Sequence, residues 1–300
     1  MLNLDKNMKK FIGSNFRIKG NNILFEDGLR VKKKLKKSNR ILPLITIITV
    51  VKNNRKYLEE TIRSVLNQKY KNIEYIIIDG GSKDGSIKII KKYIKKIDYV
   101  ISQKDKNLWD AINKGLSLAR GDLIGIVNSD DTLTPSALKM LRKYYIKYPK
   151  ADFFFGAVKK HWGILYGYKP WKIRFSWFFY SSHSTGFYIK KNAANKIGKY
   201  SLKYKHSSDF DYFFRMIVKH KLIGIASKKS ELFGNFRSGG ISSKLDYWEH
   251  FYEKNQIRID NKQNKLLLFF LMILKVILSY KNISKFKLSS FSNFIKNNIN

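Results

Sequence analysis

The pair Asp130–Asp131 is the strongest chemical signal in the sequence. It follows Leu123–Val127, a short apolar run rich in β-branched residues that predicts a buried strand. Open α/β sheets bind ligands beyond the carboxyl ends of their strands, and adjacent carboxylates there favour a hard divalent cation that carries a phosphate ligand. Because successive strand residues point to opposite sides, we expect only one of the two to bind the ion directly. A helix start before Pro135 is the alternative, and the spacing leaves both interpretations open.

A glycine-rich loop, DGGSKDGS at 79–86, follows a second apolar run at 73–78. Its glycines allow backbone N–H groups to approach a ligand closely. Asp79, at the end of the predicted strand, is placed to accept hydrogen bonds from a base or a ribose. Asp84 either does the same or caps the next helix. The loop matches neither the dinucleotide pattern GxGxxG nor the phosphate loop GxxxxGK[ST], so a plain turn also stays open.

A second pair of carboxylates, Asp209 and Asp211, lies in HSSDFDYFFRM at 206–216. The preceding serines predict a helix start, and on a helix two residues so spaced point in different directions. Asp211 stands four residues before Arg215, a spacing typical of an ion pair. Asp209 is then left to face a site as a general base, or to act only as a favourable charge near the helix N-terminus.

Alternating strands and helices are predicted to position these side chains. Short loops between them favour a doubly wound α/β domain over the first half of the chain. A further helix at 134–148 and a strand at 153–158 extend it. The predicted strands are 44–51, 73–78, 99–102 and 123–127, and the predicted helices are 57–68, 87–97 and 109–119.

Composition narrows the class of partner. The 300 residues include 60 basic and 22 acidic side chains, for a net charge of +38. Recognition of bases favours arginine, whereas the basic residues here are mostly lysine, so we expect no nucleic-acid partner. The positive field would attract anionic membranes or nucleotide-linked substrates. The chain has no cysteine, which excludes disulfides and thiolate metal sites. Without an apolar signal segment at the N-terminus, a cytoplasmic location is expected.

Four motifs together resemble the family 2 glycosyltransferases, above all the bacterial members that build surface polysaccharides. The resemblance covers about residues 43–240. It implies a GT-A fold, which is Rossmann-like, with a mixed, mostly parallel central sheet flanked by helices. It also implies an inverting transfer from a nucleotide-sugar donor, expected to be uridine-linked. The motifs are TIITVVKNN (46–54), IIIDGGSKDGS (76–86), DKNLWDAINKGLSLARGD (105–122) and IVNSDD (126–131).

The resemblance also implies roles for single residues. Asp79 would meet the uracil end of the donor, and Asp131 would be the ligand of Mn²⁺ or Mg²⁺. Asp209 would be the general base, although Ser208 stands where the family usually has glutamate. The acceptor side is expected to include Trp171 and His183. The other expected donor contacts are Thr49, Val51, Gly81, Ser82, Asp84, Asp110, Asn113, Lys114, Asp130 and Arg237.

Charge and hydropathy, together with what the resemblance implies, predict three regions. Residues 1–42 are expected to be a flexible or loosely packed basic extension, and folded structure is expected to begin at Pro43. The resemblance implies that residues 43–242 form the catalytic domain, with a nucleotide-sugar half at 43–132 and an acceptor half at 133–242. Residues 243–300 form a helical basic tail.

The apolar run Leu266–Leu274 lies in this tail and is too short to span a membrane. It predicts either a helix on an anionic membrane surface or a helix packed against protein. The first alternative would place the protein on the inner face of the cell membrane, beside a glycan or polyprenyl-lipid-linked acceptor. A basic nucleic-acid-binding protein and a catalytically silent structural protein are the competing functions.

Overall fold

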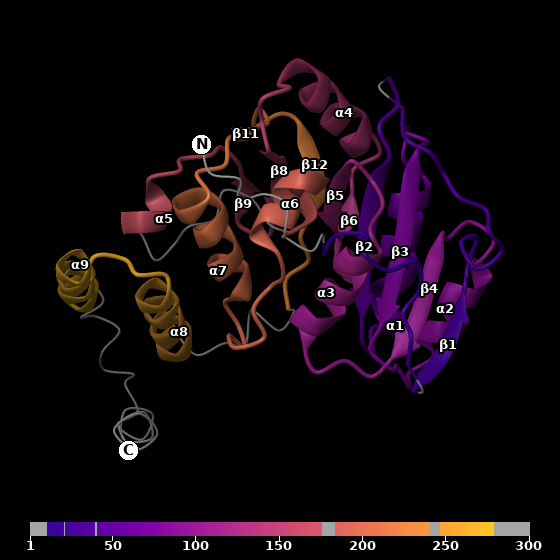
Figure 1. Ribbon diagram of the computed structural model, residues 1–300, viewed down its shortest axis with the longest axis horizontal. Helices are drawn as coiled ribbons and strands as arrows, with labels where there is room; N and C mark the ends of the chain where they lie inside the picture. The colour runs from indigo at the N-terminus through magenta and orange to yellow at the C-terminus, as the bar shows by residue number, and fades with distance from the viewer. Residues whose placement is uncertain (1–10, 21, 40, 176–183, 240–246, 279–300) are drawn as a thin grey trace, which may run out of the picture. The chain divides into compact units, whose positions relative to one another are not determined.

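Four parallel strands form the centre of the large sheet, as the sequence predicts. The computed structural model describes residues 11–20, 22–39, 41–175, 184–239 and 247–278 (Figure 1). Short β-branched runs make these strands, and all but one of their residues are buried. The four are β2 (Ile45–Val51), β3 (Ile73–Asp79), β4 (Tyr99–Gln103) and β5 (Leu123–Ile126).

The complete sheet has the order β1-β4-β3-β2-β5-β10-β7-β11. Strand β5 pairs with β2 on the side away from β3, so the winding of the chain reverses at β2. A crevice for ligands is expected beyond the carboxyl ends of strands at such a point. The β1–β4, β5–β10 and β10–β7 pairs are antiparallel. The outer strands are β1 (Ile23–Asp27), β10 (Phe187–Lys190), β7 (Phe153–Phe155) and β11 (Gly224–Ala226).

Helices cover both faces of the sheet, in keeping with the two-residue alternation of β2. Ile45 and Ile47 belong to the buried cluster that includes Leu58 of α1. Ile48 instead lies against α3, where a methyl group on Gly115 would come within 2.4 Å of it. The first face carries α1 (Arg55–Leu66), α2 (Ser86–Lys92) and α4 (Ala137–Lys147), and the second carries α3 (Leu108–Leu118).

The predicted strand at 153–158 is in fact two strands. The chain leaves the large sheet after β7 and enters a four-stranded sheet as β8, with the break at Gly156. Only glycine fits there, because a Cβ atom would come within 2.1 Å of the Phe233 ring. The small sheet contains β6 (Thr132–Leu133), β12 (Leu232–Asn235), β8 (Ala157–Lys160) and β9 (Gly163–Leu165). The remaining elements of this half are α5 (Lys172–Phe175), η1 (Ser184–Gly186), α6 (Lys191–Ile197), α7 (Ser208–Phe214) and η2 (Arg215–Lys219).

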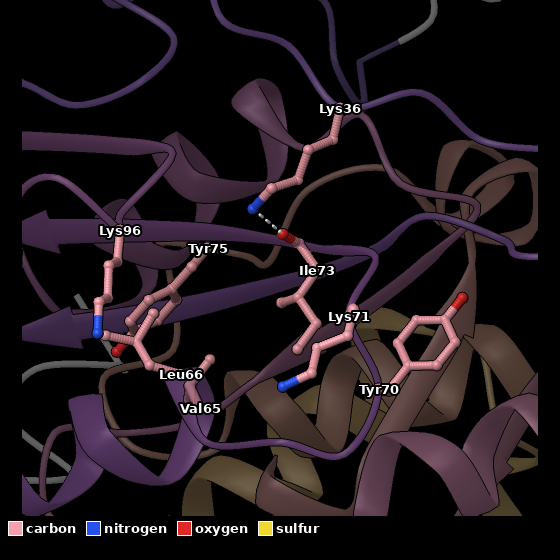
Figure 2. Close-up of a pocket in the computed structure, with 8 residues that line it drawn as sticks. All are labelled: Lys36, Val65, Leu66, Tyr70, Lys71, Ile73, Tyr75 and Lys96. Atoms are coloured by element: carbon pink, nitrogen blue, oxygen red, sulfur yellow. Dashed lines mark hydrogen bonds between the residues drawn. The ribbon is translucent and has the colours of Figure 1, made fainter.

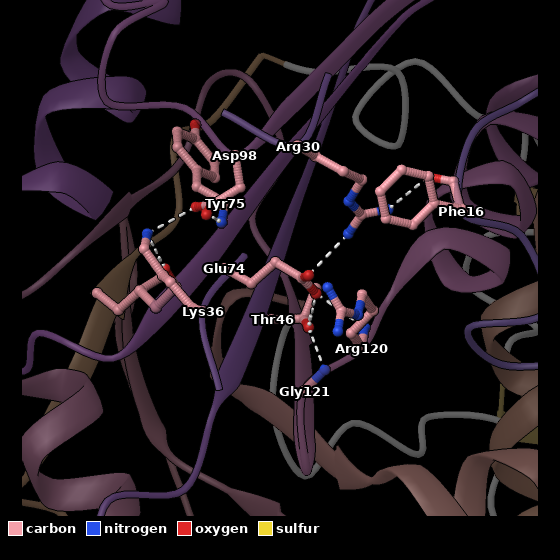
Figure 3. Close-up of polar contacts among 10 residues, drawn as sticks. Phe16, Arg30, Lys36, Thr46, Glu74, Tyr75, Asp98, Arg120 and Gly121 are labelled. Carbon is pink, nitrogen blue, oxygen red and sulfur yellow. Dashed lines mark hydrogen bonds and ion pairs between the residues drawn. The ribbon is translucent and has the colours of Figure 1, made fainter. Parts of the chain in front are cut away.

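The prediction that folded structure begins at Pro43 is wrong. Strand β1 extends the sheet beside β4, and Arg30 is buried with its guanidinium 2.7 Å from a Glu74 carboxylate oxygen (Figure 3). The other Glu74 oxygen accepts from Thr46 Oγ1 at 2.6 Å and from the backbone N–H of Arg120 at 2.8 Å. This basic segment is ordered here by its pairing with β4 and by the contact of Arg30 with the buried Glu74 carboxylate.

A second cation from the same segment makes a similar contact. Lys36 Nζ lies 2.8 Å from Asp98 Oδ2, which also accepts from the backbone N–H of Tyr75 (Figure 3). Burial raises the pKa of Asp98, and the Lys36 ammonium lowers it in part. The acidic partners lie 44 and 62 residues further along the chain, so local charge counting cannot find these pairs.

The chain divides into two compact units, residues 1–253 and 254–300. The predicted tail is helical where it is described, with α8 (Tyr247–Asp260) and α9 (Lys265–Leu278). On α9, apolar side chains at helical spacing stand exposed, namely Leu266, Phe269, Phe270, Ile273, Leu274 and Ile277. Within the part of the chain that the structure describes, none of the helices combines the length and the apolar character needed to cross a bilayer.

Candidate active site

Three loops meet beyond the carboxyl ends of β2, β3 and β5. The side chain of Asn54, after β2, donates to Ser129 Oγ after β5 at 2.9 Å. The backbone N–H groups of Asn53 and Asn54 donate to the hydroxyls of Ser82 and Ser86, which follow β3. These contacts bring the glycine-rich loop and the Asp130–Asp131 turn to one edge of the sheet, as the sequence predicts.

Asp79 is fully buried at the end of β3. Its Oδ2 accepts from the N–H groups of Gly81 and Ser82 at 3.0 Å and from Ser102 Oγ at 2.6 Å. Gly81 has φ +78°, a conformation that favours glycine and brings its N–H back to the carboxylate. Oδ1 is buried without a hydrogen-bond partner among the described residues. A buried acceptor so placed is suited to an N–H group of a ligand.

Asp84 has the capping role that the sequence left open. Its Oδ1 accepts from the backbone N–H of Ser86 at 3.0 Å, at the start of α2. Its Oδ2 accepts from the backbone N–H of Arg55 at 2.7 Å, at the start of α1. The carboxylate therefore joins two helix N-termini and fixes the loop that holds Ser82.

The segment 105–122 contributes a charged cluster. Lys114 Nζ lies 2.6 Å from Asp105 Oδ1 and 3.6 Å from Asp110 Oδ2. Burial is the main cause that raises the pKa of Asp105, and the nearby carboxylates of Asp110 and Asp79 raise it further. The structure thus places Asp105, which sequence reasoning misses, beside the predicted nucleoside site. Its position at the head of the DKN motif is the only signal that could have indicated it.

Two predicted donor contacts make hydrogen bonds within the protein. Asn113 is buried in α3, where its amide donates to the Tyr200 carbonyl at 2.9 Å and accepts from the Tyr200 N–H at 2.8 Å. Thr49 is fully buried inside β2, with its hydroxyl accepting from Tyr75 Oη at 3.1 Å. Val51 is also buried and lies in register with Asp79.

Asp131 is fully buried in the turn after β5. Its Oδ1 accepts from the backbone N–H of Arg237 at 3.1 Å, and its Oδ2 accepts from Thr185 Oγ1 at 3.0 Å. Burial, and secondly the adjacent carboxylate of Asp130, raises the pKa of Asp131 to about 7. Burial also raises the pKa of Asp130. Two carboxylates so close together in a buried place create a demand for positive charge.

The Asp130–Asp131 turn fits a divalent cation if a ligand supplies the rest of the coordination shell. In the described part of the chain, no group of three or more acidic or histidine side chains could hold an ion by itself. Magnesium-like ions, however, often take one or two carboxylates and complete their shell with phosphate oxygens and water. The Asp130–Asp131 pair therefore fits an ion that shares its ligands with a diphosphate.

Arg237 closes over this turn from the loop after β12. Its guanidinium lies 4.2 Å from the centre of the Tyr57 ring and 2.5 Å from a Glu60 carboxylate oxygen. Its Nε donates to the Asp130 carbonyl at 3.2 Å. These contacts hold Arg237 beside the Asp130–Asp131 turn.

Asp209 lies in the first turn of α7, where its Oδ1 accepts from the adjacent N–H of Phe210 at 2.7 Å. The predicted Asp211–Arg215 ion pair is confirmed, with a separation of 2.9 Å. Stacked rings connect α7 to α3: Tyr200 lies 4.2 Å from Tyr212 and 5.6 Å from Trp109, with both interplanar angles below 10°. The stack fixes the helix that carries Asp209.

Lys160, at the end of β8, is a site residue that sequence reasoning misses. Burial lowers the pKa of its ammonium, while the carboxylates of Asp131 and Asp209 raise it. One ammonium therefore interacts electrostatically with both the predicted metal ligand, Asp131, and the predicted general base, Asp209. No sequence signal distinguishes this lysine in a chain so rich in lysine.

The acceptor-side predictions have no contact that tests them. Trp171 is 55% exposed, beside α5, and His183 lies outside the described residues. A cavity of about 180 Å³ is lined by Val65, Tyr75 and three lysines (Figure 2). It lies at Ile73, where β3 begins, roughly 20 Å along the strand from Asp79. It is also smaller than the roughly 300–1,000 Å³ usual for ligand sites, so we place the active site at the other end of the sheet.

Solved structures resemble this fold at low sequence identity. TarS of Staphylococcus aureus, residues 1–349, crystallised with UDP-GlcNAc, superposes with a TM-score of 0.66 at 17% identity, covering 84% of this chain and 79% of that one. A mannosyltransferase of Pyrobaculum calidifontis, crystallised with GDP-Man and Mn²⁺, gives 0.55 at 15% identity, covering 84% and 74%. The predicted GT-A fold is confirmed.

Sequence comparison extends to the family. An uncharacterized glycosyltransferase of Methanocaldococcus jannaschii is 30% identical over 190 residues, which are 59% of this chain and 65% of the relative. The chain spans less than two thirds of the length of the curated relatives that it matches first. The model of the family "Glycosyl transferase family 2" matches residues 46–213, more than half of the chain. The chain therefore belongs to glycosyl transferase family 2.

Proposed function

We propose that this protein is an inverting glycosyltransferase that moves a sugar from a uridine-linked donor to a lipid-linked or surface-glycan acceptor. The observation that carries the proposal is the meeting of the Asp79 loop and the Asp130–Asp131 turn at one edge of the sheet. The carboxylates of Asp131 and Asp209 both raise the pKa of the Lys160 ammonium, which supports placing them on the same site. Asp131 can then hold the ion at the leaving diphosphate, while Asp209 takes the proton of the attacking hydroxyl. A single displacement at the anomeric carbon needs one base and no covalent intermediate.

In this mechanism Asp209 takes the proton of the acceptor hydroxyl as its oxygen bonds to the anomeric carbon. The bond from that carbon to the phosphate oxygen breaks, and its electron pair leaves with the nucleoside diphosphate. Asp131, with Asp130 beside it, would hold Mn²⁺ or Mg²⁺, which when bound neutralises charge on the diphosphate. The crystallisation of the Pyrobaculum mannosyltransferase with Mn²⁺ supports the choice of ion. Arg237 would hold the turn closed beside the diphosphate.

The nucleoside would lie against Asp79. Uracil carries an imide N–H, and the buried, unpartnered Oδ1 of Asp79 can accept it. Gly81 and Ser82 would line the same side, with Asp110 and Lys114 near the donor sugar. TarS, crystallised with UDP-GlcNAc, supports a uridine donor, whereas the Pyrobaculum enzyme, crystallised with GDP-Man, makes guanosine the competitor to test.

Asp79→Asn is expected to weaken UDP binding about tenfold or more. The variant amide can still accept from Gly81 and Ser82, but it would turn an N–H group toward the base and lose a charge-assisted hydrogen bond worth roughly 1.5–3 kcal/mol. Calorimetric titration of UDP in the presence of Mn²⁺ measures the effect. Lys83→Gln, an exposed change in the same loop, is the matched control. Preference of the unaltered chain for GDP over UDP, or equal UDP affinity in all three proteins, would contradict the uridine assignment.

We further propose that the acceptor is reached at the cytoplasmic face of a membrane. The exposed apolar stripe on α9 and the charge of +38 support binding to anionic lipid. The double change Phe269→Ser/Phe270→Ser should lower the vesicle-bound fraction at least tenfold, because each ring contributes about 1.5–3 kcal/mol when buried. Sedimentation with anionic vesicles measures this, and Ile146→Ser, an equally apolar exposed position on α4, is the control. Equal pelleting of all three proteins would exclude α9 as the contact.

A further inference from the structure

The register of the small sheet places Lys160 and Lys159 on opposite sides of β8. Strand β8 pairs with β12, and the Lys159 carbonyl accepts from the Phe236 N–H at 2.8 Å. Neighbouring strand residues point to opposite sides, so Lys159 is exposed and Lys160 is partly buried. The Lys160 ammonium lies 4.6 Å from the centre of the Phe236 ring. That ring immediately precedes Arg237, whose N–H binds Asp131.

The ammonium therefore lies against the loop after β12, one residue before the N–H that binds Asp131. The Asp209 carboxylate also acts on it electrostatically. If the proposed function holds, the bond that breaks lies between Asp131 and Asp209. Charge develops on the phosphate oxygen of that bond only as it breaks. A fixed cation in a partly buried place stabilises such charge strongly, because little solvent rearrangement is needed at that moment.

We propose that Lys160 is a catalytic residue whose ammonium contacts the donor diphosphate and neutralises the charge that forms on it when the sugar leaves. The inference rests on the proposed function and adds to it a second source of positive charge beside the divalent ion. The electron pair of the breaking bond stays on the phosphate oxygen next to Lys160. Lys160 takes no proton in this step, since the acceptor proton goes to Asp209.

Binding alone can test this role. UDP carries the extra negative charge that UDP-N-acetylglucosamine lacks, so UDP resembles the charge of the late reaction. Lys160→Met should weaken UDP about tenfold but the sugar nucleotide no more than about threefold, because only interactions that grow along the reaction contribute to catalysis. Titration calorimetry with Mn²⁺ gives both constants. With a working acceptor, kcat should fall about 10²-fold with little change in KM.

Two matched variants separate charge from packing. Lys160→Arg keeps a cation and should hold UDP affinity within about threefold of the unaltered chain. Lys159→Met, the neighbouring control, should bind UDP as the unaltered chain does. Equal weakening of UDP and UDP-N-acetylglucosamine by Lys160→Met, or an equal loss in the Arg variant, would show that the side chain only supports the fold. Failure of the unaltered chain to bind either ligand would instead contradict the uridine-linked donor of the proposed function.

Discussion

Asp209→Asn is expected to lower kcat by about 10²–10⁴-fold, because the acceptor hydroxyl would lose the group that takes its proton. Donor affinity should stay within about twofold, since Asp79 and the Asp130–Asp131 turn are untouched. The fold should persist, because the Asn oxygen can still accept from the Phe210 N–H. Steady-state rates over pH, with donor binding measured in parallel, test this prediction. The acidic limb of the kcat profile should disappear along with the rate.

Asp211→Asn is the matched control in the same helix. Asp211 binds Arg215 at 2.9 Å and is buried, so its loss should lower stability without changing the proton transfer. Asp209→Glu should recover part of the rate, because it restores a carboxylate at a slightly wrong distance. If Asp209→Asn keeps the activity of the unaltered chain, the base is another residue. If it loses donor binding as well, the side chain belongs to the donor site.

The central sheet was predictable because its residues follow local rules. Four β-branched runs became β2 to β5, and the glycine and aspartate residues after them became the loops of the site. The Asp211–Arg215 pair followed from helical spacing alone. Side chains at the end of a single strand, or one turn apart on a helix, can therefore be placed from sequence.

Contacts between distant segments were not predictable. Arg30 looks like one more cation in a basic stretch until β3 brings Glu74 beside it. Lys160 is likewise indistinguishable from other lysines until β8 and β12 pair. Asn113 shows the opposite case, because a helix face that looks available for a ligand is contacted by the Tyr200 backbone. A polar residue type suggests binding, but only packing decides whether its groups are already used.

The contacts of the basic side chains also argue against the competing nucleic-acid function. Several cations that raise the net charge are already paired with acids of the same chain, among them Lys36 with Asp98 and Lys114 with Asp105. Recognition of a nucleic-acid base would need an available guanidinium, but that of Arg237 contacts Glu60 and Tyr57. Charge is thus used to order the fold and the site, besides any attraction to an anionic surface.

Asp131→Asn is expected to abolish metal-assisted transfer and, without metal, to stabilise the protein at alkaline pH. The folded state raises the pKa of Asp131 from 3.8 to about 7. Its protonated form is therefore favoured in the fold. The stability that this proton contributes is complete below about pH 4 and is lost as the pH rises through 7, at most about 4 kcal/mol in total. Asparagine cannot ionise, and it keeps an oxygen for the Arg237 N–H and an amide for Thr185.

Urea unfolding in chelator at pH 5 and pH 8.5 measures the two halves of this prediction. The variant should exceed the unaltered chain by a few kcal/mol at pH 8.5 and by much less at pH 5, because the carboxyl group of the unaltered chain is then largely protonated. Mn²⁺ at pH 8.5 should close the gap by stabilising only the unaltered chain, since an ion that binds the native state raises its stability. Equal pH dependence in both proteins would place the ionisable group elsewhere. If Mn²⁺ still stabilises Asp131→Asn, another residue binds the ion. Asp130 is then the next residue to substitute, because the same turn holds both carboxylates and only Asp131 is fully buried.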